Sequence, residues 1–276
     1  MGESRSTLVH DVRNQLSAML MLISLLEKVE LTSDIHVVGG GYYGFDISGR
    51  LDCHVYVINS GSELAIVDPG CGINKDFDTV LSNIRDDGLD PKKIRKIFVT
   101  HYHCDHVGAA AEARTILDAE MCAAKSVATH IRNGDEKAAS LDVGKAVGFY
   151  PEDFKLKPCE VDLELSEGDI VQIGSLTMET FETPGHCEGH LSFLLSGGER
   201  KYLFGGDMVF WGGKILLQNI HDCKIDVYAD SIFKIEELDF DALLPGHLQI
   251  SLNNGKSHVN QAADYFRKLG IPPNIV

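Results

Sequence analysis

The stretch VTHYHCDHVG, residues 99–108, constrains this chain more than any other feature. It places three histidines and an aspartate, His101, His103, Asp105 and His106, within six positions directly behind a short β-branched run. Imidazole and carboxylate groups gathered this densely are costly to bury unless a cation lies between them. We therefore expect a strand that ends at a metal site, and the rest of the chain must complete that site.

Three further candidate ligands each follow an apolar, strand-like run, where a chain leaves a sheet and side chains can converge on one edge. They are His186 in FETPGHCEGH, Asp207 in YLFGGD and His247 in ALLPGH, each preceded by a glycine that allows a sharp turn. Seven N/O ligands are too many for one tetrahedral cation, but they suit two cations that share a bridging carboxylate. The thiols of Cys104 and Cys187 are expected to point away from these cations.

Composition narrows the class of protein. The 276 residues are 44% hydrophobic, which is enough for one domain with a sizeable core. The formal net charge of −16 leaves no surplus of Lys and Arg to neutralise phosphates, so a small neutral or cationic molecule is a better partner than a nucleic acid. Seven cysteines scattered without a CxxC pair predict free thiols and a cytoplasmic protein. The apolar residues 16–26 are too few to span a membrane, and no signal-peptide cleavage site follows them.

Residues 1–30 predict an N-terminal docking or dimerisation helix ahead of a main domain at residues 31–276. Residues 7–30 contain no Gly or Pro and are rich in Leu and Met. Within them, HDVRNQL is similar to the phosphoacceptor box of sensor histidine kinases, with Gln15 where a proline normally stands. That resemblance would make His10 a phosphoacceptor. No ATP-binding region follows, so we favour a helix that docks on a partner or pairs two copies in a homodimer.

From about residue 35 onward, the pattern alternates between short apolar strands and amphipathic helices. Hairpins are expected at residues 54–70 and 190–207, and two more strands flank the EGD turn within residues 161–183. Strands are also expected at residues 93–100, leading into the first motif, and at residues 241–247. The remaining segments predict helices, with Ser257 as the N-cap of the last: residues 77–86, 108–119, 229–238 and 257–270.

Two sheets covered by helices would satisfy this order of elements. Residues 129–158 are polar and mixed, and we interpret them as a partly helical insertion near the site.

The motifs resemble those of the metallo-β-lactamase superfamily. THYHCDH, with Asp68 in VDPG upstream and PGH, GGD and PGH downstream, reproduces the order of that family's motifs over about residues 35–250. The resemblance implies an α/β fold of the αββα sandwich type, with two β-sheets flanked by helices and the metals in the cleft between the sheet edges. It also implies a binuclear hydrolase of the lactonase or glyoxalase-II-like branch.

The resemblance also implies a role for each ligand. It assigns His101, His103 and His186 to the first cation, Asp105, His106 and His247 to the second, and Asp207 to the bridge between them. Asp68 would orient a ligand without binding metal, and His190 is expected to form hydrogen bonds near the site. Asp105 is the candidate to orient the nucleophile and shuttle its proton. We expect two divalent cations, zinc first, with iron or manganese as alternatives.

A hydroxide held between two such cations would attack a carbonyl group, so hydrolysis is the expected reaction. The residues after His247 are too few for the glutathione-holding helical extension of glyoxalase-II-like enzymes, which favours a small lactone, ester or thioester. Ordinary structural roles are expected for His36, His54, His130 and His258. The substrate pocket is expected to involve Tyr42, Tyr43, Phe45, Phe210, Trp211 and His221.

Two other functions remain open at this point. Persulfide dioxygenases of the same superfamily bind a single iron through the equivalents of His101, His186 and Asp207, and ligand types alone do not choose between zinc and iron. The second alternative is a signalling or scaffold protein that the N-terminal helix dimerises and whose metal domain senses a ligand.

Overall fold

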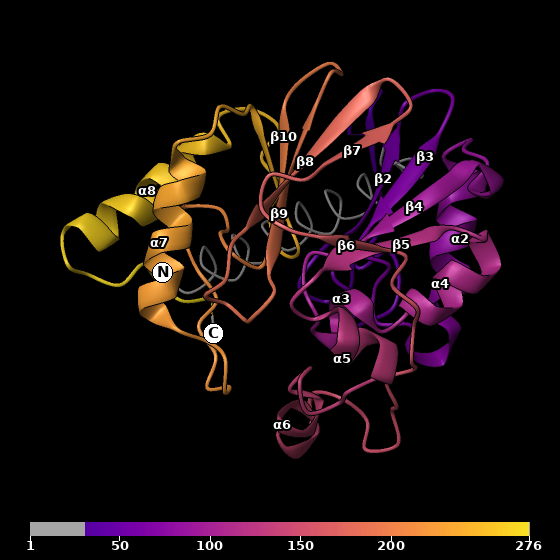
Figure 1. Ribbon diagram of the computed structural model, residues 1–276, viewed down its shortest axis with the longest axis horizontal. Coiled ribbons are helices and arrows are strands. Elements are labelled where there is room, and N and C mark those ends of the chain that lie inside the picture. The colour runs from indigo at the N-terminus through magenta and orange to yellow at the C-terminus, as the bar shows by residue number, and fades with distance from the viewer. Residues whose placement is uncertain (1–30, 276) are drawn as a thin grey trace, which may run out of the picture.

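The computed structural model describes residues 31–275, which form two β-sheets packed face to face between layers of helices (Figure 1). The helix predicted over residues 1–30, and His10 within it, lie outside the described residues. The α/β sandwich predicted from the sequence is confirmed.

The first sheet has six strands in the order β1-β2-β3-β4-β5-β6. The pairs β1–β2 and β2–β3 are antiparallel, and the later pairs are parallel. Their bounds are β1 Ile35–Gly39, β2 Val55–Asn59, β3 Leu64–Val67, β4 Ile94–Phe98, β5 Glu120–Ala124 and β6 Leu163–Leu165.

The second sheet has five strands in the order β11-β10-β9-β8-β7. All its pairs are antiparallel except β10–β11, which is parallel. Their bounds are β7 Ile170–Ile173, β8 Leu176–Glu182, β9 Leu191–Ser196, β10 Tyr202–Gly206 and β11 Ala242–Pro245.

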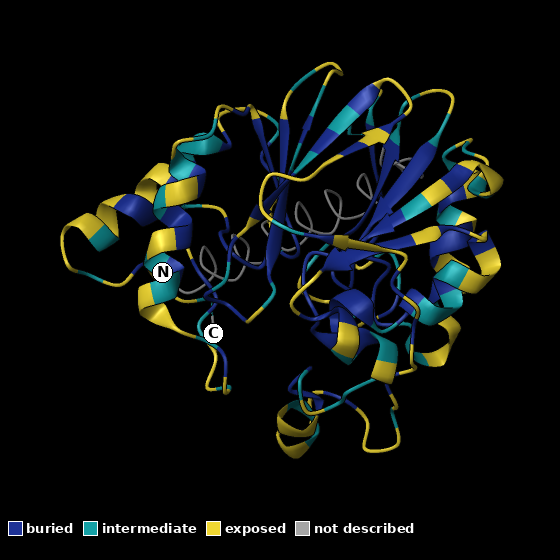
Figure 2. Cartoon of the chain, in the orientation of Figure 1, coloured by how far each residue is buried: buried dark blue, intermediate teal, exposed yellow. Residues whose placement is uncertain are grey.

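Helices cover the outer faces of both sheets: α2 and α4 lie outside the first, and α7 and α8 outside the second (Figure 1). The strands between them are largely buried, whereas the outward faces of the helices are exposed (Figure 2). The helices and 3-10 turns are η1 Ile73–Lys75, α2 Asp76–Asp86, η2 Pro91–Lys93, α3 Cys104–Val107, α4 Ala110–Leu117, α5 Ala128–Asn133, α6 Leu141–Ala146, α7 Ile225–Glu236 and α8 Lys256–Arg267.

The spacing of apolar residues explains the longer helices. In α2, Phe77, Val80, Leu81 and Ile84 recur at helical spacing and are all buried, so a single stripe packs on the first sheet. The exposed Asp78 lies in the first turn of α2, where a negative charge complements the helix dipole.

Two local predictions were wrong. Residues 161–183 form three strands, and the EGD turn joins β6 of the first sheet to β7 of the second. Ser257 does not cap α8, because the helix begins one residue earlier behind Gly255 and has no side-chain cap. A Cβ on Gly255 would lie 2.4 Å from the backbone nitrogen of Leu243, so only glycine allows this close approach.

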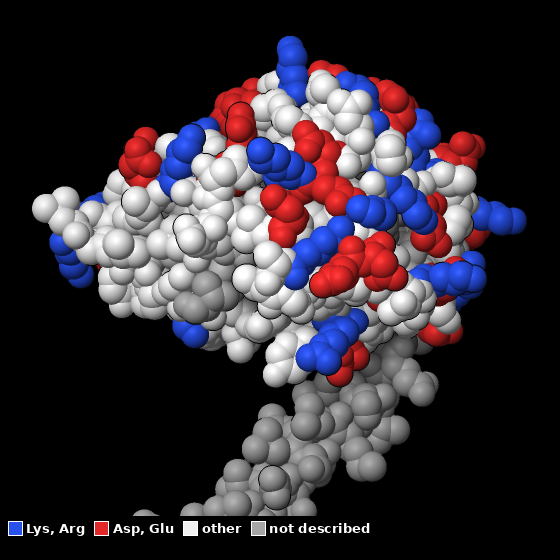
Figure 3. All heavy atoms as spheres, turned by 90° about the horizontal axis from the view of Figure 1, so that it is seen from below, with Lys and Arg blue, Asp and Glu red and all other residues white. Residues whose placement is uncertain are grey.

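Three further properties concern apolar helices, cysteines and surface charge. Within residues 31–275, no helix combines the length and apolar character needed to cross a membrane. All seven cysteines are free, as the sequence predicted. On the face in Figure 3, acidic and basic side chains are interspersed over the part of the molecule on the right of the view.

Candidate metal centre

Three histidines, His101, His103 and His186, form what we call the first cluster. His101 and His103 follow β4, and His186 follows β8, so the two sheets meet here. Nδ1 of His103 lies 3.1 Å from Nε2 of His101 and 3.0 Å from Nε2 of His186. Ligand nitrogens bound about 2.0–2.1 Å from a tetrahedral zinc ion are roughly 3.3 Å apart, so this convergence fits one cation.

Hydrogen bonds determine which ring nitrogens in this cluster carry protons. Thr100 Oγ1 donates to Asp68 at 2.7 Å, so it accepts from Nδ1 of His101 at 3.0 Å. Nδ1 of His186 donates to the carbonyl oxygen of Leu216 at 3.0 Å. The Nε2 atoms of both neutral rings therefore present lone pairs to the centre of the cluster, where a cation would satisfy them.

Asp105, His106, His247 and Asp207 form the second cluster. Nε2 of His247 lies 3.0 Å from Asp105 Oδ2 and 3.6 Å from Asp207 Oδ2, and Nε2 of His106 lies 3.5 Å from Asp207 Oδ1. Asp207 Oδ2 is also 3.8 Å from Nε2 of His186, in the first cluster. Asp207 therefore stands between the clusters, where a bridging carboxylate would stand.

The second cluster contains polar atoms that nothing in the described structure satisfies. Nε2 of His106 and Oδ1 of Asp207 are buried without a hydrogen-bond partner among the described residues. A buried polar atom without a partner is costly. A divalent cation next to these atoms would remove that cost, so the donor set fits a metal ion.

The electrostatics of the site agree with cation binding. Burial lowers the pKa of His101, His103 and His186, to about 4 for His103, so these rings are neutral. Burial raises the pKa of Asp207, but His247 and His106 outweigh this and hold it well below its ordinary value. Neutral imidazoles and ionised carboxylates are the forms that bind metal ions.

In the second cluster, His247 lies between the carboxylates of Asp105 and Asp207, which raise its pKa. Burial lowers the pKa of His247, but Asp207 and Asp105 outweigh it, and the pKa is raised. A proton on His247 therefore lies between two carboxylates. A cation in that place would interact with the same oxygens and displace the proton.

Groups around the ligands hold them in place. Asp68 Oδ2 accepts from Nδ1 of His106 at 2.9 Å, which leaves Nε2 of His106 free to face the second cluster. Nε2 of His190 accepts the backbone N–H of Asp207 at 3.2 Å, and its Nδ1 donates to Thr183 at 2.9 Å. Asp68 and His190 thus lie behind the ligands and form hydrogen bonds with them.

One glycine is needed for the second cluster to form. A Cβ on Gly246, which precedes His247, would lie 2.4 Å from Asp207 Oδ1 and 2.6 Å from His106 Cε1. Any side chain there would enter the space between these ligands.

One residue at the site, Tyr150, was not predicted from the sequence. Its hydroxyl donates to Asp105 Oδ1 at 3.1 Å, and the ring is buried against Phe154. Tyr150 belongs to the insertion at residues 129–158, which was expected near the site, but nothing in its local pattern distinguishes this aromatic residue from others. Asp105 therefore has a hydrogen-bond donor at Oδ1 and a ligand histidine at Oδ2.

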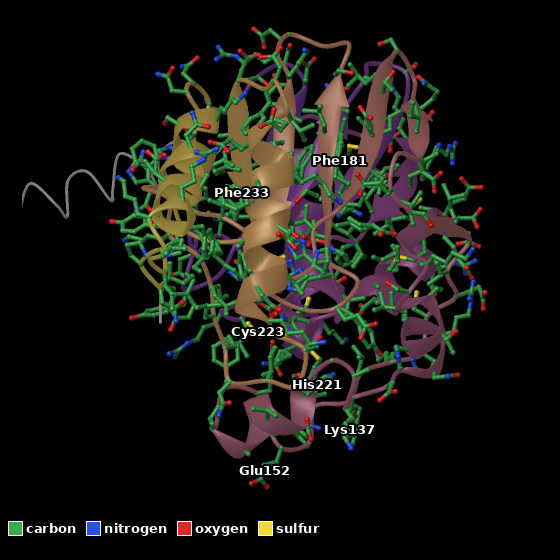
Figure 4. All side chains as sticks on the ribbon, turned by 60° about the vertical axis from the view of Figure 1, so that its left-hand side comes forward. Lys137, Glu152, Phe181, His221, Cys223 and Phe233 are labelled. Atoms are coloured by element: carbon green, nitrogen blue, oxygen red, sulfur yellow. The ribbon has the colours of Figure 1, made fainter. Side chains whose placement is uncertain are left out.

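A cavity of about 240 Å³ opens beside the first cluster. Figure 4 shows Lys137, from the insertion, close to His221, from the loop before α7. The cavity brings these two residues together with His103 of the first cluster. The other lining residues are Tyr102, Val127, His130, Asp135, Ala138, Cys187, Glu188 and Asp222.

The structure places the expected pocket aromatics in different surroundings. Tyr43 is half exposed, and its ring lies edge-on 6.5 Å from that of His247. Tyr42 is exposed against Tyr43, with ring centroids 5.3 Å apart. Phe45 stacks on His54 at 4.9 Å. The loop that carries all three aromatics thus lies beside the second cluster.

The other two expected pocket aromatics are not brought to the cavity. Phe210 is fully buried, and its backbone pairs with Lys214 in a tight turn. Trp211 is half exposed and packs against His258 at 4.4 Å. The burial of Phe210 depends on the tertiary packing around the turn after β10, which a pattern of single residues does not reveal.

Cys187, whose thiol was expected to point away from the cations, lies close to the first cluster. Its sulfur lies within 4.8 Å of a ligand nitrogen of each histidine in the first cluster, and the side chain is buried beside the cavity. Cys104 is buried too, but it belongs to no cluster of this kind among the described residues.

The remaining histidines are held by ordinary partners. His36 pairs with Asp87 at 2.9 Å, and Nε2 of His54 donates to the carbonyl oxygen of Leu248 at 2.8 Å. His130 pairs with Asp135 at 2.9 Å, although it also lines the cavity.

Comparison with known sequences points to one family. The sequence model of the metallo-beta-lactamase superfamily matches residues 48–247. A hydroxyacylglutathione hydrolase of Rhodopseudomonas palustris is 30% identical over 158 residues, which are 57% of this chain and 49% of that protein. A beta-lactamase-like protein 2 homolog of Caenorhabditis elegans is 25% identical over 224 residues, 80% of this chain and 64% of that protein. The chain thus spans about half the length of the hydroxyacylglutathione hydrolase it matches.

Solved structures show the same architecture. A beta-lactamase from Chitinophaga pinensis superposes with a TM-score of 0.67 at 17% identity, covering 88% of this chain and 92% of that one. The metallo-beta-lactamase GOB-18 from Elizabethkingia meningoseptica gives a TM-score of 0.66 at 19% identity, covering 87% and 89%. At these identities the likeness establishes a shared fold.

Proposed function

The chain belongs to the metallo-beta-lactamase superfamily, and from this premise we propose that it hydrolyses a small thioester, ester or lactone with two divalent cations. The observation that carries the proposal is the pair of adjoining clusters, which Asp207 joins. Its Oδ2 lies 3.8 Å from a nitrogen of the first cluster and 3.6 Å from one of the second. If only the first cluster bound a metal ion, the buried Nε2 of His106 would remain without a partner.

The two clusters would hold one cation each, with zinc favoured by a donor set of nitrogen and carboxylate oxygen. Cations bound there would acidify a water molecule and polarise a carbonyl oxygen, which is the chemistry that hydrolysis needs.

The chain's own residues would position the reaction. Asp105 is ionised because His106 and His247 outweigh the effect of burial and hold its pKa below the ordinary value. Its Oδ1 faces the hydroxyl of Tyr150. Burial raises the pKa of Tyr150 well above its ordinary value, so the hydroxyl stays protonated and can donate a hydrogen bond. Asp105 can therefore accept a hydrogen bond from a nucleophilic water and orient it at the edge of the second cluster, while Tyr150 fixes the carboxylate plane.

The cavity indicates what kind of substrate the site would accept. Lys137 is the cationic residue of its lining, against the carboxylates of Asp135, Glu188 and Asp222. Such a lining favours a neutral or cationic group over a polyanion. The hydroxyacylglutathione hydrolases, by their name, cleave an acyl-glutathione, so a thioester with a small acyl group leads the list of substrates to test.

Metal content and a substrate panel test the proposal together. Protein purified anaerobically should contain about two divalent cations per chain and should hydrolyse members of a panel of thioesters, esters and lactones, but not phosphodiesters. Asp207→Ala should lose much of the metal and reduce turnover by several orders of magnitude, because the bridge is removed. Asp239→Ala, a similar change at an exposed carboxylate paired with Lys201, should leave both unchanged.

Two outcomes would contradict this function. One iron per chain together with oxygen consumption on persulfides would identify a dioxygenase instead. Retention of both cations and a near-normal rate in Asp207→Ala would show that the ligands are assigned wrongly.

A further inference from the structure

We propose that the cavity beside the first cluster binds an ammonium group of the substrate, and that the carboxylate of Asp222 recognises this group. The substrate would then be a thioester or ester whose acyl part carries an amino group. The inference rests on the proposed function, because it assigns a substrate class to the same site. The observation that carries it is a buried carboxylate oxygen in the wall of the cavity, without a hydrogen-bond partner among the described residues.

The two oxygens of Asp222 have different surroundings. Its side chain is 9% exposed, and Oδ1 is buried without a hydrogen-bond partner in the described part of the chain. Oδ2 accepts the backbone N–H of Glu188 at 2.9 Å, which fixes the carboxylate. A buried carboxylate oxygen without a donor is costly, and charged donors form the strongest hydrogen bonds with carboxylates. An ammonium group would supply the donor that Oδ1 lacks.

The position of Asp222 connects this oxygen to the candidate metal centre. Asp222 lines the cavity of about 240 Å³ together with His103, a candidate ligand of the first cluster. It also lines a neighbouring cavity of about 340 Å³. The backbone N–H that Oδ2 accepts belongs to Glu188, two residues after the candidate ligand His186. A substrate with its carbonyl group at the cations can therefore place an amino group on a short acyl chain against Asp222.

The other charged residues of the cavity also favour a cation. Glu188 is exposed and adds a second carboxylate beside Asp222. Asp135 is already paired with His130 at 2.9 Å, so it adds little. Lys137 is exposed, and its ammonium group can extend into water while the stem stays at the cavity. The potential close to Asp222 is therefore negative, which attracts a cationic group.

His221 is the residue that must move to admit the ligand. Its Nδ1 lies 3.6 Å from Asp222 Oδ1, beyond hydrogen-bond distance, and 3.5 Å from Ser140 Oγ, at the outer limit of a hydrogen bond. The His221 side chain is 59% exposed, and exposed side chains change rotamer rapidly. The ring can therefore turn aside into water and leave Oδ1 to an entering ammonium group.

Ligand binding tests the subsite without an activity assay. The probes are β-alaninamide, whose amine is protonated at neutral pH, and butanamide, in which a methyl group replaces the ammonium group. Full-length protein should bind β-alaninamide at least about 10-fold more tightly than butanamide, measured by ligand-observed NMR. Asp222→Asn keeps an acceptor for the backbone N–H of Glu188 but removes the charge, so it should bind the two amides equally.

Two further variants serve as controls. Asp135→Asn removes a carboxylate from the lining of the same cavity, but one that His130 already pairs, so the preference for β-alaninamide should remain. His221→Ala should keep the preference too, because the ring only lies beside Oδ1. A merely structural role of Asp222 would lower the free energy of unfolding in Asp222→Asn without changing the ratio of the two affinities.

Turnover of two matched substrates gives a second readout. The N-acetylcysteamine thioesters of β-alanine and of butanoic acid differ by the same exchange of an ammonium group for a methyl group. In the wild type, kcat/KM should be at least about 10-fold higher for the β-alanyl thioester. The ratio of the two kcat/KM values should approach one in Asp222→Asn and stay at the wild-type value in Asp135→Asn.

The outcomes separate the two proposals. Equal binding of the two amides by the wild type overturns the ammonium subsite, as does a preference that persists in Asp222→Asn or disappears in His221→Ala. Equal turnover of the two thioesters overturns the amino-bearing acyl group and leaves the hydrolase intact. A protein that prefers β-alaninamide but hydrolyses no thioester, ester or lactone overturns the proposed function and leaves the subsite in place.

Discussion

Hydrogen bonds from neighbouring groups orient the candidate ligands of the second cluster. Asp68 holds His106, and His190 holds the backbone of Asp207. Tyr150 does the same for Asp105 from a segment 45 residues away along the chain. Changes at such orienting residues should act through the ligand they hold and leave the fold in place.

Tyr150→Phe tests this for Asp105. The change removes only the hydroxyl, so the ring still packs against Phe154, but Asp105 Oδ1 loses its donor. We expect kcat to fall roughly 10-fold with metal content retained and KM little changed. Steady-state kinetics and elemental analysis measure these quantities.

The matched control is Tyr202→Phe, which removes a hydroxyl bonded to Thr32 at 2.8 Å, away from both clusters. It should lower the free energy of unfolding slightly and leave kcat unchanged. A Tyr150→Phe enzyme with wild-type kcat would show that Tyr150 is structural only.

Gly246→Ala tests the space between the ligands. The added methyl group would lie 2.4 Å from Asp207 Oδ1, so the carboxylate must move. We expect one of the two cations to bind at least about 10-fold more weakly while the other is kept. Titration of the metal-free protein with zinc measures both affinities.

Gly270→Ala serves as the control for this change. A Cβ there meets its nearest atom at 3.4 Å, an ordinary contact, so both zinc affinities should stay at wild-type values. Equal affinities in Gly246→Ala and wild type would mean that the second cluster tolerates displacement of its bridge.

Among helices and strands, those that rest on local pattern were predictable from the sequence. The apolar stripe of α2 and the alternating hairpins around β2–β3 and β9–β10 follow from spacing within a few residues. The candidate ligands were equally accessible, because all of them follow strands and three of them, His186, Asp207 and His247, directly follow a glycine.

What the sequence could not reveal depends on contacts between distant segments. Strand β6 has three residues and gains its place by pairing with β5, about forty residues earlier, so no local pattern assigns it to the first sheet. Tyr150 reaches Asp105 across a similar distance. The Cys187 sulfur comes within 4.8 Å of the first-cluster nitrogens only in the folded chain, and no spacing rule encodes that approach.

Asp76, in the first turn of α2, should make the free energy of unfolding depend on pH. Burial raises the pKa of Asp76 from 3.8 to about 6, and the charge of Asp52 adds to this shift. The folded state therefore prefers protonated Asp76. The contribution of this acid to the free energy of unfolding is fully present below pH 4 and is lost as pH rises through about 6.

Asp76→Asn should remove this dependence, because the amide stays neutral. Above pH 6 the variant should exceed the wild type in free energy of unfolding by about 1 kcal/mol, allowing for solvent screening of a partly exposed group, and the gain should vanish near pH 4. Denaturant unfolding at pH 4 and pH 7.5 measures it. Asp78→Asn, an exposed change in the same turn, should bring no such gain, and a pH-independent effect of Asp76→Asn would contradict the argument.

The two sheets are joined through the proposed metal centre as well as through the core. The first motif follows β4 of the first sheet, whereas His186, Asp207 and His247 follow strands of the second. Cations bound at both clusters would therefore cross-link the halves of the sandwich, and they would neutralise Asp105 and Asp207, whose carboxylates face the same space.

Removing the metal should accordingly destabilise the entire domain. A ligand that binds only the folded state at 1,000 times its Kd adds about 4 kcal/mol, and for a domain of this size each kcal/mol shifts Tm by roughly 2–4 °C. We expect chelation to lower Tm by roughly 10 °C and zinc to restore it. In Asp207→Ala, which lacks the bridge, chelator and zinc should have much smaller effects on Tm. If full removal of the metal leaves the wild-type Tm unchanged, the core alone holds the sheets together and the ligands serve chemistry without contributing to stability.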